Sequence, residues 1–125
     1  MNPPSTGERR RLKRRKLSYY MLVFDGYTQK TIGHLVDISP TGLMVDCPNP
    51  LPLEREYHLR LDTTSDVANQ NYITFTARSK WCRPDSFDPF LYDVGFSILT
   101  ISPQAAAVVR RISEKYAAQD EYHFS

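Results

Sequence analysis

Two groups of side chains in this sequence have the types and spacing that ligand binding requires. The first is a run of basic residues at positions 9–16, which holds seven of the sixteen Lys and Arg residues of the chain. Arg10 and Arg14 lie four residues apart within it, and so do Arg11 and Arg15, one residue out of register. Arginine carries a planar fork of donors that matches phosphate oxygens and the O6 and N7 acceptors of guanine. The run therefore predicts contact with an anionic partner at one place.

The second group is a short polar stretch in the middle of residues 36–45. Apolar residues lead into it and out of it, which indicates two strands joined by a tight turn. Asp37 and Ser39 can bond nearby backbone, Pro40 presets φ, and Gly42 permits a positive φ or the close approach of a ligand. Standing alone, this pattern predicts a turn and nothing more.

The order of the two groups is more specific than either one. An R-x-x-x-R pattern followed about two dozen residues later by D-x-S-x-x-G resembles the PilZ family, whose members are bacterial receptors for cyclic di-GMP. The matching residues are Arg10, Arg14, Asp37, Ser39 and Gly42. The resemblance spans roughly residues 8–112 and includes Trp-Cys-Arg at 81–83 and Tyr-Asp-Val-Gly-Phe at 92–96, which are similar to later strands of that fold.

The resemblance implies a role for each matching residue. Arg10 and Arg14 would clamp a flat, doubly charged ligand from opposite sides, by stacking on its guanines and pairing with its phosphates. Asp37 would accept from the N1–H and N2–H₂ edge of guanine or orient an arginine. Ser39 would donate to a phosphate or a base, and Gly42 would leave room for the ligand to lie against bare backbone.

Several further positions are predicted as ligand contacts with alternatives left open. Arg9 immediately precedes the motif, and PilZ members with an arginine there tend to bind a stacked pair of ligand molecules. Arg11 and Arg15 offer the same spacing in the other register. Trp81 lies where some members place a tryptophan near a guanine, although a lone tryptophan in a strand is more often part of the core.

The charge and composition of the chain exclude several classes of function. Outside the basic run, nine basic residues face fourteen acidic ones, a balance of 9 − 14 = −5, so a protein that coats nucleic acid over its whole surface is not expected. Cys47 and Cys82 are isolated and no histidine has metal spacing, so we predict reduced thiols, a cytoplasmic location, and no metal or cofactor. No apolar run reaches the ~20 residues of a membrane-spanning helix, no secretory signal is evident, and no catalytic motif is found.

The rest of the chain predicts the elements that position these groups. Strand-forming segments, several of them with alternating apolar residues, occupy residues 17–25, 30–36, 42–47, 56–61, 72–81 and 91–99. Ser102 and Pro103 indicate a helix start, and an apolar stripe predicts a helix over residues 103–119 that packs against the sheet. We therefore expect a mainly β protein, a six-stranded antiparallel barrel with a C-terminal α-helix, the fold that the PilZ resemblance also implies.

These expectations combine into one functional hypothesis. Residues 1–16 would be a flexible basic arm that carries R-x-x-x-R, and residues 17–120 a PilZ-like barrel domain. The chain would be a non-enzymatic cyclic di-GMP receptor or adaptor whose arm closes over the D-x-S-x-x-G hairpin and changes the surface offered to an unidentified downstream protein. The alternatives are a PilZ-like adaptor that acts through protein contacts without nucleotide, and a small barrel that binds nucleic acid through its basic arm.

Overall fold

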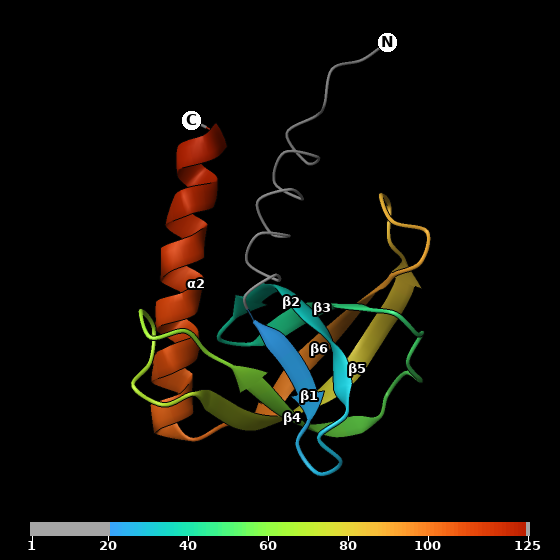
Figure 1. The fold of residues 1–125 in the computed structure, drawn as a ribbon, viewed down its shortest axis with the longest axis horizontal. Coiled ribbons are helices and arrows are strands. Elements are labelled where there is room, and N and C mark those ends of the chain that lie inside the picture. The colour runs from blue at the N-terminus through green and yellow to red at the C-terminus, as the bar shows by residue number, and fades with distance from the viewer. Residues whose placement is uncertain (1–20, 125) are drawn as a thin grey trace.

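The computed structural model describes the backbone of residues 21–124 and the side chains of residues 21–115. Six strands are followed by one helix in this part of the chain (Figure 1). The strands are β1 (Leu22–Asp25), β2 (Thr31–Ser39), β3 (Gly42–Cys47), β4 (Glu56–Asp62), β5 (Tyr72–Pro84) and β6 (Tyr92–Thr100), and the helix is α2 (Pro103–Phe124).

The strands close into a barrel in the order β1-β2-β3-β6-β5-β4, and β4 returns to pair with β1. Every neighbouring pair is antiparallel. The predicted class, a six-stranded antiparallel barrel with a C-terminal helix, is confirmed. Closure leaves none of the six described strands at a free edge of the sheet, and it places β6 between β3 and β5, which are far apart in sequence.

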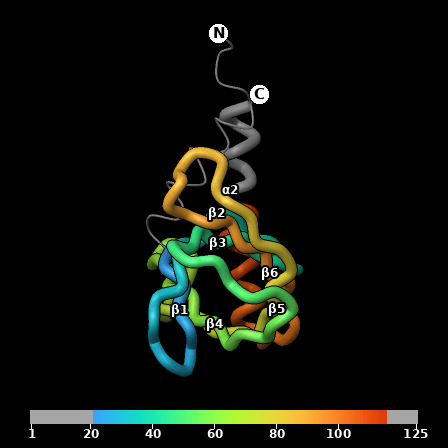
Figure 2. Tube along the Cα trace, turned by 90° about the vertical axis from the view of Figure 1, so that its right-hand side faces the viewer, coloured from blue at the N-terminus to red at the C-terminus, as the bar shows by residue number. Residues whose placement is uncertain are grey.

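Alternation along the strands fills the barrel with apolar side chains. In β5, for example, Ile73, Phe75 and Ala77 are buried, while Tyr72 and Thr74 face outward. The tube in Figure 2 shows the chain enclosing this core, with the connection between β5 and β6 standing clear of the barrel. The interior is therefore a packed hydrophobic core, and any binding surface must lie outside it.

The helix α2 covers one side of the barrel, as its stripe predicted. Ala105, Val108, Val109 and Ile112 are all buried and belong to the same cluster as the barrel core. Ser102 caps the helix, because its Oγ accepts from the Ala105 N–H at 3.1 Å. The helix continues to Phe124, beyond the predicted end at residue 119, and no Gly or Pro occurs there to stop it. No described helix is long and apolar enough to cross a bilayer.

Most strand boundaries lie within a few residues of the predicted ones. β5 runs to Pro84, three residues past the predicted end at Trp81, because its last residues pair with the start of β6. Part of the first predicted strand, residues 17–25, lies outside the described residues, as does the proposed boundary between the arm and the barrel at residues 16 and 17.

Candidate functional site

A bulge in β2 sets the direction of Asp37. The pairing of β2 with β3 shifts between Leu35 and Asp37, so Leu35 and Val36 are both buried although they are neighbours. A bulge of this kind re-aims the side chains that follow it. Asp37 therefore points outward and Ile38 inward. Both Asp37 and Ser39 lie within β2, so the prediction that they form part of the turn is wrong.

The turn itself is only Pro40 and Thr41, between the end of β2 and the start of β3. It is tied to β6 by the Ile98 N–H, which donates to the Thr41 carbonyl at 2.9 Å. Ser39 makes looser contacts: its Oγ lies 3.4 Å from Thr41 Oγ1, from the Thr41 N and from the Gly42 carbonyl oxygen. Bonds of that length are at the weak end of the range, so this hydroxyl can be given to a ligand at small cost.

Gly42 is required for a reason that the sequence did not reveal. Its φ is not positive, so the expected left-handed conformation is absent. A Cβ at this position would instead lie 2.6 Å from the backbone carbonyl oxygen of Phe96. The space in the Cβ direction of Gly42 is therefore taken by the neighbouring strand β6. The expected role of this glycine, to let a ligand lie against bare backbone, stays a prediction.

A pocket of about 320 Å³ opens beside the turn, on the outer surface of the barrel. Its volume is at the small end of the range for small-molecule sites. It is formed by β2, β3, β5 and β6, and the side chains around it are partly polar. The lining residues are Asp37, Ile38, Ser39, Gly42, Leu43, Met44, Lys80, Trp81, Gly95, Phe96 and Ser97.

Trp81 is held flat in the pocket wall by a glycine. A Cβ on Gly95 would lie only 2.1 Å from Trp81 Cε2, so the indole occupies the space that a side chain at position 95 would fill. Trp81 remains 39% exposed. The Arg83 guanidinium lies 4.7 Å from the centroid of the indole ring, a cation–π contact. The tryptophan is thus a preformed aromatic surface and not part of the core.

Comparison with known families assigns this fold. The PilZ domain family matches residues 8–115, which is most of the chain. The chain belongs to the PilZ domain family. PilZ domains are non-enzymatic receptors for cyclic di-GMP.

The similarity of this PilZ chain to individual proteins is low. No curated protein matches it. Among solved structures it is similar to that of the Borreliella burgdorferi PlzA protein in complex with c-di-GMP, with 13% sequence identity and a TM-score of 0.48. The similarity covers 92% of this chain and 58% of the PlzA chain.

The PilZ site predicted from the sequence falls into two parts in the structure. Asp37, Ser39, Gly42 and Trp81 line the same pocket although residues 42 and 81 are far apart in the chain. The predicted arginines of the arm are Arg9, Arg10, Arg11, Arg14 and Arg15, and all of them lie outside the described residues. Lys80 and Ser97 also line the pocket, and neither was predicted, because their position at the pocket depends on strand order.

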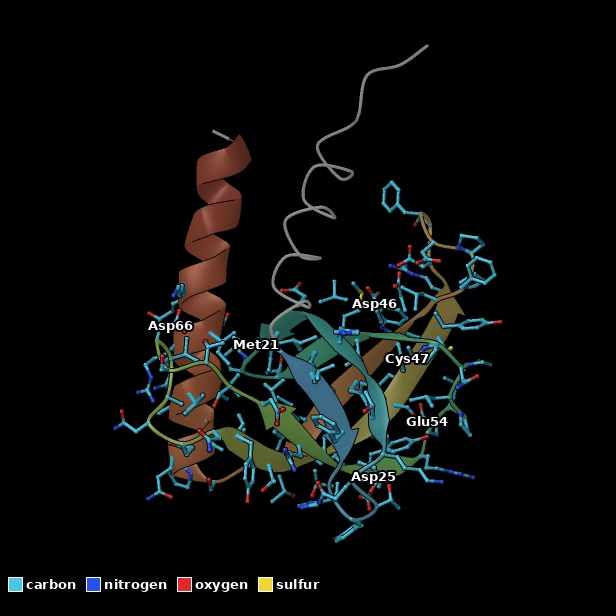
Figure 3. The ribbon with its side chains drawn as sticks, viewed as in Figure 1. Met21, Asp25, Asp46, Cys47, Glu54 and Asp66 are labelled. Carbon is cyan, nitrogen blue, oxygen red and sulfur yellow. The ribbon has the colours of Figure 1, made fainter. Side chains whose placement is uncertain are left out.

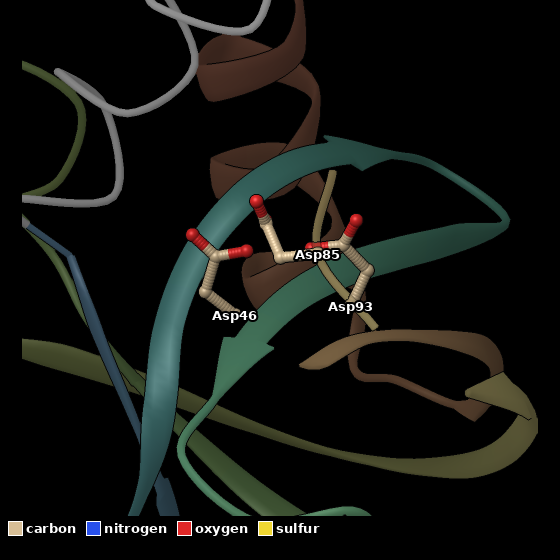
Figure 4. Close-up of side chains that lie close together, drawn as sticks. All are labelled: Asp46, Asp85 and Asp93. Carbon is tan, nitrogen blue, oxygen red and sulfur yellow. The ribbon is translucent and has the colours of Figure 1, made fainter. Parts of the chain in front are cut away.

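A cluster of three buried carboxylates, outside the pocket lining, was also missed. Asp46, Asp85 and Asp93 bring ligand-type oxygens within 4.8 Å of one another (Figure 4). Asp46 and Asp93 are cross-strand partners, an arrangement that is destabilising for like charges unless it is compensated. Part of the compensation is visible: Arg83 Nε lies 3.9 Å from Asp93 Oδ2, and all three carboxylates have other interactions.

The carboxylate oxygens of this cluster are suited to a hard cation such as Ca²⁺ or Mg²⁺. In this PilZ domain, however, these carboxylates already interact with other groups of the protein. Asp85 Oδ1 accepts from the backbone N–H groups of Phe87 and Asp88 at 2.7 and 3.0 Å. Cys47 is next to Asp46, and burial, with the neighbouring Cys82, Asp46 and Asp93, raises the pKa of its thiol to about 12. We therefore interpret the cluster as structural support for the loop above it.

Proposed function

We propose that this PilZ domain is a receptor for cyclic di-GMP, which binds in the pocket beside Asp37, Ser39 and Trp81. The observation that carries the proposal is that one pocket brings together an outward carboxylate, a loosely bonded hydroxyl and a preformed aromatic surface. Guanine needs an acceptor for its N1–H and N2–H₂ edge and a flat surface on which to stack, and a phosphate needs a donor. The three groups supply these in one place.

In this proposal the arginines of residues 9–16 complete the site. Lys80 is the only cationic side chain among the described residues that line the pocket, and Glu54 already pairs with it at 2.9 Å. Two phosphates therefore call for additional positive charge, which Arg10 and Arg14 would supply as bidentate forks. Arg9 would contact a second, stacked ligand molecule, and Arg11 and Arg15 are the alternative register.

The proposed response is a change in the surface shown to another protein. When the arm closes over the pocket, its charge moves to the outer face of β2, β3, β5 and β6, and a downstream protein would read that change. The cytoplasm is the proposed location, since Cys47 and Cys82 are both free thiols.

Calorimetric titration with cyclic di-GMP tests the proposal. We expect saturable binding by the wild type at tens of micromolar ligand or below, and a loss on the order of 10- to 100-fold for Arg14→Ala, the effect of one charge-assisted contact. Arg14→Lys should bind almost as poorly, because it keeps the charge but loses the fork. Arg110→Ala is the matched control, since Arg110 is exposed on α2 away from the pocket.

Two other results would replace the proposal. If the wild type does not bind cyclic di-GMP, an adaptor that acts through protein contacts without nucleotide becomes the better hypothesis. Affinity that grows with oligonucleotide length and falls steeply with salt would indicate a nucleic-acid-binding barrel. Arg15→Ala, titrated in parallel, distinguishes the two arginine registers: Arg14 and Arg15 cannot both be the second arginine of the motif.

A further inference from the structure

The connection between β5 and β6 exposes aromatic side chains where a loop usually shows polar ones. We call residues 85–91 the aromatic loop. Phe90 is 82% exposed and Phe87 is 49% exposed, although they are only three residues apart. The loop stands clear of the barrel, and side chains extend from it into solvent (Figures 1 and 3). Single exposed apolar residues are common, but two aromatic residues exposed on one projecting loop are typical of an interaction surface.

The backbone beneath these rings is held firmly. Asp85 Oδ1 accepts from the N–H groups of Phe87 and Asp88, and Asp88 Oδ1 accepts from the Phe90 N–H at 2.9 Å. The Asp85 N–H also donates to the Leu91 carbonyl at 3.0 Å, and the Leu91 N–H to the Asp88 carbonyl at 3.1 Å. A loop whose shape is fixed in advance loses little conformational entropy when it binds. The loop backbone therefore holds both phenylalanines in defined positions at the surface.

The charge of the loop indicates which class of partner it can bind. Between Pro84 and Tyr92 the chain carries two aspartates and no Lys or Arg. Asp85 is buried, so the charge shown at the surface is that of Asp88, between the two rings. An anionic bilayer would be repelled by such a tip. A protein surface with an apolar hollow flanked by basic side chains is complementary to it.

We propose that the aromatic loop is a docking surface for a partner protein, which receives Phe87 and Phe90 in an apolar hollow and places Lys or Arg beside Asp88. Aromatic side chains in such positions commonly carry most of the binding energy of an interface. The surface is separate from the ligand pocket and does not depend on nucleotide binding.

Selection from a phage-displayed library of random peptides tests the proposal on the full chain. We expect the selected peptides to converge on sequences that combine apolar residues with Lys or Arg. Their affinity should fall at least roughly tenfold for Phe90→Ser and further for Phe87→Ser/Phe90→Ser, as is usual for aromatic anchors. Asp88→Asn keeps an oxygen for the Phe90 N–H, so it should cost less and should reduce the salt dependence of binding.

Tyr27→Ser is the matched control. Tyr27 is 81% exposed, as much as Phe90, but it lies on the β1–β2 turn and stacks on His58 at 4.7 Å. Peptides that bind the Phe90→Ser protein as well as the wild type, or that lose binding with Tyr27→Ser, would overturn the proposal. So would Phe90-dependent sedimentation with phosphatidylcholine–phosphatidylglycerol vesicles, or Phe90-dependent dimers in analytical ultracentrifugation, since these outcomes assign the loop to a membrane or to a second copy.

Discussion

The polar segment at residues 37–42, which contains the β2–β3 turn, and the aromatic loop at residues 85–91 lie at opposite ends of the same pair of strands. Gly42 pairs with Ser97 at one end of β3 and β6, and Cys47 pairs with Tyr92 at the other. Beside the turn, at the end of β2, Ser39 Oγ has contacts of 3.4 Å. In the loop, the Asp85 carboxylate accepts at 2.7 and 3.0 Å. Loosely bonded polar atoms are available to a ligand, whereas tightly bonded ones hold a shape.

This difference assigns the two ends to different kinds of partner. The turn borders a pocket and offers the Ser39 hydroxyl, whose present contacts are weak, which suits a small polar ligand. The loop commits its carboxylates to its own backbone and leaves apolar rings outside, which suits a protein surface. Trp81 and Arg83, which stack on each other in β5, lie between the two ends.

The largest effect expected from this comparison concerns the thiol beneath the loop end. Burial raises the pKa of Cys47 from 9.0 to about 12, so at mildly alkaline pH its thiolate fraction should be roughly a thousandfold lower than in the unfolded chain. Cys82 is only half-buried. We expect iodoacetamide to label Cys82 and spare Cys47, as mapped by mass spectrometry, with Cys82→Ser leaving the folded protein unreactive.

The same shift has a consequence for stability. Because the folded pKa lies above the unfolded value, the unfolded state releases the Cys47 proton first, and stability falls as pH rises from about 9 through about 12. Labelling of Cys47 in folded protein at the rate seen in denaturant would show that the loop end opens readily. The contrast between a firmly bonded loop and the loosely bonded Ser39 hydroxyl would then be wrong.

The second prediction concerns the close approach of backbone at the turn end. Gly42→Ala places a Cβ 2.6 Å from the Phe96 carbonyl oxygen, and a backbone atom cannot rotate away as a side chain does. We expect a loss of about 1–3 kcal/mol, the usual cost of overpacking, measured by urea unfolding. Thr41→Ala, in the exposed turn next to it, should change stability little. Wild-type stability of Gly42→Ala would mean that β3 and β6 can separate there.

Local sequence patterns were sufficient for the elements but not for their arrangement. Alternation predicted β5 because Ile73, Phe75 and Ala77 all face one core, and a capped apolar stripe predicted α2. The direction of Asp37 was not predictable, since it depends on a bulge created by pairing with β3. The packing need for Gly42 was not predictable either, because its neighbour, the Phe96 carbonyl, belongs to a strand more than fifty residues later.

The candidate site, like the fold, was predictable from the sequence only in part. The family resemblance selected Asp37, Ser39 and Trp81, and the fold places all three at one pocket. Nothing local indicated that Gly95 would carry the Trp81 indole, or that Asp46, Asp85 and Asp93 would meet. Each of these relations joins residues from different strands or loops, and such contacts follow from strand order and register, which single-strand periodicity does not contain.

The third prediction tests the firmness of the loop. Asp85→Ala removes the acceptor of the Phe87 and Asp88 N–H groups, and leaving such donors unmet costs about 1–3 kcal/mol when they are buried. Here the cost should be at the lower end, because the change also relieves repulsion from Asp46 and Asp93. We expect faster hydrogen exchange at these two amides. Asp85→Asn keeps the accepting oxygen and should preserve their protection; equal exchange in both variants would contradict the role of this carboxylate.

The smallest effect on stability is expected for Ser39→Ala. This variant also distinguishes best between groups that bind a ligand, at the turn end of β3 and β6, and groups that hold a shape, at the loop end. Because the Ser39 hydroxyl contacts its neighbours only at 3.4 Å, Ser39→Ala should change the free energy of unfolding by no more than about 0.5 kcal/mol, as for a surface site. Its affinity for cyclic di-GMP should fall by the worth of one hydrogen bond, about 0.5–1.5 kcal/mol, or roughly 2- to 10-fold. Ser39→Thr restores a hydroxyl and should recover part of that affinity.

Urea unfolding and calorimetric titration of the same Ser39→Ala samples measure its effect on stability and its effect on affinity. A variant that loses stability but not affinity would place Ser39 with Asp85, among the groups that hold a shape, and would remove Ser39 from the proposed ligand contacts.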